Sequence, residues 1–281
     1  MDSNFPDSII IFDTTMRDGE LAPNIEFSLQ QKITLAQLLE EVGVDVIEIG
    51  YPGQSAKDFK EFPEICRSLK KAVACGLAGT KELEISRAAQ CLKLCLRGRI
   101  HTYTNVRVNS QNRNHKEIVL QEIESSISLA RRFCEDVQWS AFDAPRSEPE
   151  FLFKAIEIAI ESGATTVNIP DSLGLCNVEQ FSQLMADIFN NVSNLDKAVV
   201  SVHCHNDKGL AVSNSLAALE WGVGQIECSI NGLGARKGNA DLIEIVEAIV
   251  AQNKYRVNCD RALLYRVSEW LRDAIPAWEG T

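Results

Sequence analysis

Short apolar segments alternate with amphipathic segments along nearly the whole chain. Eight runs rich in β-branched and other apolar residues have the length and composition of buried β-strands. These runs are residues 9–15, 45–52, 72–78, 99–106, 136–145, 165–172, 198–207 and 225–234. The segments between them have helical spacing; "SLQQKITLAQLLEEVG", for example, places its apolar residues along one side and closes with Gly43. A strand followed by a helix therefore recurs along the chain.

Eight strand–helix units within roughly 250 residues predict a single-domain α/β fold, a (β/α)8 TIM barrel. A doubly wound parallel sheet is the alternative. We expect the barrel to occupy residues 1–254 and a helical tail to occupy residues 255–281, around "DRALLYRVSEWLRDAIPAW". The apolar stripe of this tail must cover either the barrel's own surface or a partner, and we predict a homodimer formed through barrel helices.

Composition narrows the class of protein. The 281 residues are 45% hydrophobic and carry a formal net charge of −11. They contain no basic block, so we expect the protein not to bind nucleic acid. There is no apolar run of about 18 residues, so we expect no membrane association. Nine cysteines without a Cys-x-x-Cys pair predict reduced thiols that fill the core of a cytoplasmic protein.

Polar residues collect where the predicted strands end, which is where barrels of this class place their active sites. In "SVHCHNDKG", His203 and His205 are two residues apart and point to the same face of a strand. A pair of hydrogen-bonded core histidines would give the same pattern. However, Asp18 in "DTTMRDGE" lies at the end of the first strand, which would neighbour the eighth strand in a closed barrel. Two imidazoles together with a carboxylate suit a divalent cation. Arg17 is either a surface partner of Asp18 or a group that stabilises a developing oxyanion.

Four motifs resemble, in order, those of the DRE-TIM metallolyase superfamily: "FDTTMRDGE", "IEIGYPGQS", "SVHCHND" and "NGLGARKGN". They are most similar to the 2-isopropylmalate synthase branch, with homocitrate and citramalate synthases as relatives. The resemblance implies a Claisen condensation of acetyl-CoA, or another acyl-CoA, with a 2-oxo acid whose carbonyl is polarised by Arg17 and a metal. It implies one divalent metal (Zn, Mn, Mg or Co) held by Asp18, His203, His205 and Asn239.

The resemblance also implies an oxo-acid pocket, at which this chain departs from the family. The pocket positions that match are His101, Ser140, Pro170 and Ser172. Phe142 stands where the family has a glutamate that is a candidate catalytic acid or base, and phenylalanine cannot transfer a proton. Asp143 is a poor substitute, because strand alternation points it away from the barrel mouth. Gly79 stands where the family has an arginine.

Three functions are therefore open. The first, which we favour, is an acyltransferase of altered substrate choice, in which Phe142 shapes the pocket. The second is a metal-dependent carbon–carbon lyase or aldolase, although "NGLGARKGN" lacks the cysteine of the hydroxymethylglutaryl-CoA lyases. The third is a non-catalytic subunit that binds a 2-oxo acid or a partner. Synthases of this branch continue past the barrel into a linker and a regulatory region. Because this sequence ends at Thr281, we expect neither region here. We expect a separate protein to supply the linker's function.

Overall fold

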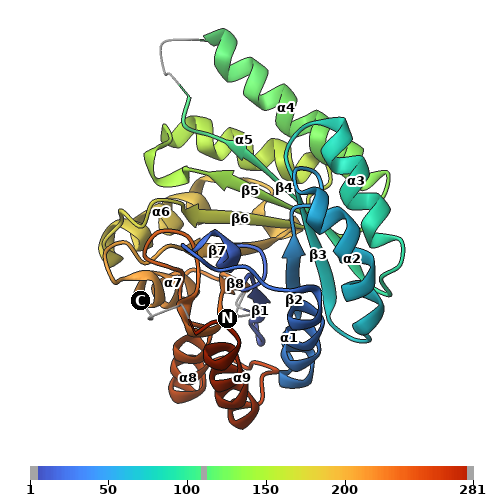
Figure 1. The fold of residues 1–281 in the computed structure, drawn as a ribbon. Coiled ribbons are helices and arrows are strands. Elements are labelled where there is room, and N and C mark those ends of the chain that lie inside the picture. Colours follow the sequence, from blue (N-terminus) through green and yellow to red (C-terminus); the bar gives the residue numbers. More distant parts are fainter. Residues whose placement is uncertain (1–5, 109–112, 277–281) are drawn as a thin grey trace.

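The computed structural model describes residues 6–108 and 113–276 (Figure 1). Eight parallel strands form a closed barrel in sequence order, and β8 pairs with β1 to complete it. The strands are β1 (Ile10–Asp13), β2 (Val46–Gly50), β3 (Val73–Ala78), β4 (Gly98–Asn105), β5 (Val137–Phe142), β6 (Thr166–Asp171), β7 (Val199–Cys204) and β8 (Gln225–Cys228). The predicted TIM barrel is thus confirmed, each predicted run overlaps one strand, and the doubly wound alternative is excluded.

Helices surround the barrel and follow the strands in the expected order. They are α1 (Leu29–Val42), α2 (Ala56–Ser68), α3 (Glu82–Leu92), α4 (Arg113–Arg131), α5 (Pro149–Glu161), α6 (Val178–Asn191), α7 (Ala211–Leu219), α8 (Leu242–Gln252) and α9 (Arg261–Ala274). The main apolar core lies between the outer face of the barrel and these helices, where Ile11, Val167 and Val202 of the strands meet Leu39 and Ile156 of the helices. In the described part of the chain, no helix is long and apolar enough to cross a membrane.

The interior of the barrel is mostly polar, unlike the apolar layers that commonly fill this fold. Near the amino ends of the strands, Arg99 Nη1 donates to Gln225 Oε1 at 2.7 Å. Gln138 Nε2 donates to Glu227 Oε1 at 2.5 Å, which connects this floor to the residues above it. A small apolar group fills the space beside this network: Phe12, Val46, Val73 and Cys75. The polar floor therefore supports the side chains that point toward the mouth.

Helix α9 packs against α1 and α8 of the same chain (Figure 1). Its apolar residues Leu264, Val267 and Leu271 are buried there, and Ile275 beyond it is buried as well. The stripe that could have covered a partner thus covers the barrel itself. The helix predicted within residues 255–281 is present, while residues 277–281 lie outside the described part of the chain.

The expectation that all nine cysteines are reduced thiols is wrong for one pair. Cys66 at the end of α2 and Cys95 after α3 form a disulfide, with their Cα atoms 4.9 Å apart. The packing of α2 against α3 brings the two segments together, and the linear spacing of the cysteines gives no sign of this. The other seven cysteines are free; six are buried, as expected of core residues, and Cys134 is half-buried.

Asp13, at the end of β1, is a fully buried carboxyl group on the outer face of the barrel. Burial raises its pKa to about 7, although hydrogen bonds from the Thr15 hydroxyl (2.6 Å) and backbone N–H (3.0 Å) oppose the shift. The unfolded chain loses this proton near the ordinary value of 3.8, so between pH 4 and 7 the folded state holds the extra proton. Asp13 therefore lowers the free energy of unfolding as the pH rises through that window.

Replacing Asp13 by asparagine should remove this pH dependence. Because one pKa unit corresponds to about 1.4 kcal/mol, the variant should gain up to about 4 kcal/mol relative to the wild type between pH 4 and 8. Urea unfolding of both proteins at several pH values measures the difference. Parallel curves of unfolding free energy against pH would show that the pKa of Asp13 is the same in the folded and unfolded protein.

Candidate functional site

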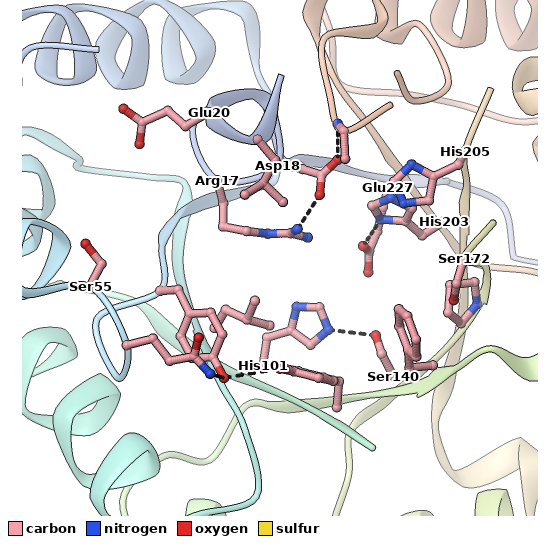
Figure 2. A pocket seen from close by; sticks show the side chains of 18 of the residues that line it. Arg17, Asp18, Glu20, Ser55, His101, Ser140, Ser172, His203, His205 and Glu227 are labelled. Atoms are coloured by element: carbon pink, nitrogen blue, oxygen red, sulfur yellow. Dashed lines mark hydrogen bonds and ion pairs between the residues drawn. The ribbon is translucent and has the colours of Figure 1, made fainter. Parts of the chain in front are cut away.

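A cavity of about 850 Å³ opens at the carboxyl ends of the strands (Figure 2). Nine of the ten residues predicted to form the site line it: Arg17, Asp18, His101, Ser140, Phe142, Pro170, Ser172, His203 and His205. The tenth, Asn239, hydrogen-bonds to two of them. The volume lies within the range of small-molecule binding sites. The structure thus brings together all the residues that the sequence proposed for this place.

Asp18, His203 and His205 place their potential ligand atoms within 4.8 Å of one another. His203 and His205 lie on the same side at the end of β7, and their ring centroids are 4.8 Å apart. Asn239 joins the group: its Nδ2 donates to Asp18 Oδ2 at 2.9 Å, and its Oδ1 lies 3.1 Å from His203 Nε2. Four nitrogen and oxygen donors from the ends of β1, β7 and β8 therefore converge at one point.

A buried carboxylate fixes the orientation of His203. Glu227, in the middle of β8, is fully buried, and its Oε2 lies 2.7 Å from His203 Nδ1. This leaves His203 Nε2 facing Asp18 and Asn239. His205 turns its Nδ1 toward the carbonyl oxygen of Gly238 at 3.3 Å, which leaves its other nitrogen available. Such partners on the far nitrogen are the usual support of metal-binding histidines.

The protonation states of Asp18 and His205 suit cation binding. Burial alone would raise the pKa of Asp18, but Arg17, His203 and His205 outweigh burial and hold it well below the ordinary value. Burial, together with the neighbouring His203, lowers the pKa of His205 to about 3, so its ring is neutral. An ionised carboxylate and a neutral imidazole are the forms that bind divalent metals. Burial opposes protonation of His203, but Glu227 and Asp18 raise its pKa, so a bound metal would displace a proton from this ring. The donor set thus fits the divalent metal implied by the sequence.

The glycine-rich loop after β8 permits the close approach of Asn239 to Asp18. A Cβ added at Gly234 would lie 2.3 Å from Asn239 Nδ2 and 2.8 Å from Asp18 Oδ2. Any side chain there would push these two groups apart. "NGLGARKGN" therefore brings the loop backbone against the donor group, which is the role that its glycines suggested.

Arg17 lies beside this group and is held by two carboxylates. Its Nη1 donates to Asp18 Oδ1 at 2.5 Å, and its Nε donates to Glu48 Oε2 at 2.6 Å. Glu48 is fully buried on β2, and its Oε1 lies 2.7 Å from His101 Nδ1. Burial opposes ionisation of Glu48, but Arg17 and His101 lower its pKa to about 2. Arg17, whose side chain is 15% exposed, is thus a half-buried, oriented cation rather than a surface partner of Asp18.

The loop that carries Arg17 and Asp18 is anchored by a buried ammonium group. Lys32 of α1 is 1% exposed and binds Glu20 Oε2 at 2.7 Å and Asp58 Oδ1 at 3.3 Å. Glu20 also accepts a hydrogen bond from the backbone N–H of Phe27. The loop after β1 is therefore fastened to α1 and to α2, and this fixes where the loop places its two charged groups.

His101 and Ser140 form the wall opposite Arg17 and Asp18 (Figure 2). His101 Nε2 lies 2.7 Å from Ser140 Oγ, and Asn168 Nδ2 donates to the same oxygen at 2.8 Å. Ser172 accepts a hydrogen bond from the backbone N–H of Asp143 at 2.9 Å, which links β5 to β6. His101, Ser140 and Ser172 line the cavity as the family resemblance implied, and Asn168 lines it as well.

Position 142 offers the cavity an apolar ring. Phe142 is 40% exposed and tilts against Tyr103, with ring centroids 6.4 Å apart. Asp143 pairs instead with Arg146 at 2.5 Å and does not line the cavity, so the expectation that it points away from the mouth is confirmed.

Several residues of the site were missed by sequence reasoning. Glu48 and Glu227 each stand inside an apolar strand, in "VIEIG" and "QIEC", and a charged residue in the middle of a buried run could have revealed them. Tyr51 and Tyr103 left no comparable signal, because aromatic residues are common in strands.

Glu48, Cys75 and His101 form a second group of potential ligands within 4.8 Å of one another. Burial raises the pKa of Cys75 well above its ordinary value, so this thiol stays protonated. Both oxygens of Glu48 already serve Arg17, His101 and the hydroxyl of Thr14. This second group therefore acts as hydrogen-bonded support for the site and does not suit a cation.

Comparison with known proteins agrees with this geometry. Residues 8–271 match the model of the HMGL-like family. The chain is 42% identical over 271 residues to a 2-isopropylmalate synthase of Caulobacter vibrioides, a match covering 94% of this chain and 52% of that protein. It is 44% identical over 252 residues to the 2-isopropylmalate synthase of Aquifex aeolicus, a match covering 89% of this chain and 48% of that protein. The chain spans about half the length of these curated relatives.

Solved structures give the same fold. A hydroxymethylglutaryl-CoA lyase from Pseudomonas aeruginosa aligns with a TM-score of 0.81 at 17% identity and covers 99% of this chain and 96% of that one. An HMG-CoA lyase from Acinetobacter baumannii, solved with coenzyme A and 3-methylmalate, aligns with a TM-score of 0.80 at 19% identity, covering 98% and 93%. The family match extends over nearly the whole barrel and agrees with the motifs of the sequence, and the chain therefore belongs to the HMGL-like family.

Proposed function

We propose that the chain is a divalent-metal-dependent acyltransferase that condenses an acyl-CoA with a 2-oxo acid. The observation that carries this proposal is the convergence of Asp18, His203, His205 and Asn239 beside the oriented cation of Arg17, at the mouth of the barrel. Identity of 42–44% to 2-isopropylmalate synthases supports the reaction class. The A. baumannii lyase structure with bound coenzyme A supports an acyl-CoA as one substrate.

The reaction requires a new carbon–carbon bond and the release of a thiol. The acyl-CoA loses a proton from the carbon next to its carbonyl, and this carbon bonds to the keto carbon of the 2-oxo acid. The keto oxygen gains a proton and becomes a hydroxyl group. Water then cleaves the thioester and releases free coenzyme A. When bound, the metal supplies a Lewis acid for the keto and carboxylate oxygens of the acid.

The chain's own residues orient the substrate and stabilise negative charge. Arg17, whose position is fixed by Glu48 and Asp18, lies where a guanidinium can stabilise the oxygen that gains charge as the keto group reacts. His101 and Ser140 present a hydrogen-bonding pair on the opposite wall for the acid. Phe142 contributes no proton transfer, and general acid–base help is typically worth about 10²–10⁴-fold. We therefore propose a substrate pair that differs from that of the related synthases.

The proposed ligands can be tested by metal analysis. His203→Ala combined with His205→Ala should abolish binding of one divalent cation per chain, because two of the donors are lost. His101→Asn is the matched control: it removes a histidine from the same cavity but outside the donor group, and should leave metal content unchanged. Elemental analysis after dialysis against Zn²⁺ or Mn²⁺ gives the result. Full metal content in the double variant would place the cation elsewhere.

The proposed reaction can be tested with a panel of 2-oxo acids and acetyl-CoA, following thiol release, alongside calorimetric titration of the same acids. We expect slow turnover of 2-oxoisovalerate, since the glutamate position is Phe142. Efficient turnover of 2-oxoisovalerate would contradict altered substrate choice. Binding without turnover of any acid would favour the non-catalytic subunit, and cleavage of a condensed product would favour the lyase.

The homodimer remains a prediction, and the burial of the α9 stripe within the chain leaves it supported by the family resemblance alone. The cytoplasmic location and a separate protein that supplies the linker's function also remain predictions. One chain has a mass of 31.1 kDa, and light scattering at micromolar concentration should give twice that mass. A mass of a single chain would rule out the dimer.

A further inference from the structure

Three aromatic rings form a continuous strip along one side of the cavity. Tyr51 follows β2, Tyr103 lies on β4 and Phe142 ends β5, and all three line the cavity. Tyr51 and Tyr103 meet edge to face with ring centroids 6.3 Å apart, and Tyr103 and Phe142 are 6.4 Å apart at a tilt of 59°. Both distances lie within the range of stabilising aromatic pairs. We call these three residues the aromatic strip.

The hydroxyl groups of the aromatic strip are already engaged within the protein. Tyr51 OH donates to Glu84 Oε2 at 2.5 Å and accepts a hydrogen bond from Gln54 Nε2 at 3.1 Å. Tyr103 OH lies 3.3 Å from Tyr51 OH. Because Tyr51 gives its proton to Glu84, Tyr103 is the donor in that contact. A ligand therefore meets the ring surfaces of the strip and finds no free hydroxyl proton to accept.

Gly79 leaves room for this arrangement. Its backbone N–H donates to Glu84 Oε2 at 2.8 Å. A Cβ at this position would lie 2.7 Å from Glu84 Oε2 and 3.0 Å from Tyr51 OH. The departures from the family at positions 79 and 142 thus both affect the aromatic strip. Gly79 leaves space for the hydrogen-bonded pair of Tyr51 and Glu84, which anchors the strip. Phe142 adds a ring to it.

The aromatic strip lies across the mouth from the proposed metal ligands. The strip belongs to the β2–β5 side of the closed barrel, whereas Asp18, His203 and His205 belong to β1 and β7. Tyr103 and Phe142 are each two residues beyond His101 and Ser140 on their strands, so they stand one layer nearer the mouth. An acid held by its polar end at the donor group can therefore extend its side chain over His101 and Ser140 toward the strip.

Part of this apolar surface is uncovered. Phe142 is 40% exposed, and Leu77, which also lines the cavity, lies on β3 between the strands that carry Tyr51 and Tyr103. Exposed apolar surface inside a cavity favours a ligand that removes it from water. A side chain as small as a methyl group leaves most of the strip uncovered, whereas a planar ring can pack against it.

We propose that the 2-oxo acid substrate carries an aromatic side chain, which packs against the strip formed by Tyr51, Tyr103 and Phe142. This inference rests on the proposed function, because it assumes that the polar end of the acid binds at the donor group. It names the substrate class that the altered position 142 selects. The condensed product would then be a 2-substituted malate bearing an arylmethyl group.

Calorimetric titration of the Mn²⁺-loaded protein with phenylpyruvate, 2-oxoisovalerate and pyruvate tests the inference without requiring turnover. Phenylpyruvate should bind at least about tenfold more tightly than pyruvate, since an aromatic contact and the burial of a ring together provide that factor. Phe142→Ala should weaken phenylpyruvate about tenfold and change pyruvate less than about twofold. Phe133→Ala is the matched control: Phe133 is 52% exposed and precedes β5 at the opposite end of the barrel, so all three affinities should stay unchanged.

Each outcome decides a different claim. Equal affinities for the three acids, or preference for pyruvate, would overturn the aromatic substrate and leave the proposed function standing. An equal loss for all three acids in Phe142→Ala would also overturn it, because the ring would then support the site as a whole. If none of the acids binds to the metal-loaded protein, the proposed function falls, and this inference falls with it.

Discussion

The geometry of the site depends on two carboxylates buried inside the barrel. Glu48 holds Arg17 and His101, and Glu227 holds His203, each through contacts of 2.6–2.7 Å. Removing one partner of a buried ion pair costs about 3–5 kcal/mol. Glu48 and Glu227 therefore strongly favour the observed positions of the side chains that they bind. The orientation of the guanidinium and of both rings therefore follows from the barrel strands that carry Glu48 and Glu227.

Strand alternation converts this constraint into layers. Inward-facing residues two positions apart place Gln138, Ser140 and Phe142 of β5 at three successive heights. The lowest layer is a polar floor, the middle layer holds the groups proposed to orient the acid, and the highest layer presents an apolar ring at the mouth. The same strand thus links the support of Glu227 to the surface that we propose selects the substrate. A substitution in one layer leaves the side chains of the other layers in place. Position 142 can therefore differ from the family while the donor group is kept.

The sequence predicted the elements whose signal is local. Apolar runs marked all eight strands, and the spacing of His203 and His205 predicted that they share a face. It could not predict which strands lie opposite one another at a given height, because barrel register depends on pairing between distant segments. For that reason Glu48 and Glu227 were missed as partners of the histidines, and Tyr51 and Tyr103 as neighbours of Phe142. The Cys66–Cys95 disulfide was missed because it depends on how α2 and α3 pack.

The proposed function depends most directly on Asp18, His203 and His205 holding one divalent cation at the barrel mouth. Anomalous diffraction from crystals grown with Mn²⁺ tests it directly, since the metal's position is read without reference to activity. A single strong peak per chain is expected between the Asp18 carboxylate and the two imidazoles. A peak elsewhere, or no peak at this place in Mn²⁺-saturated crystals, would contradict it.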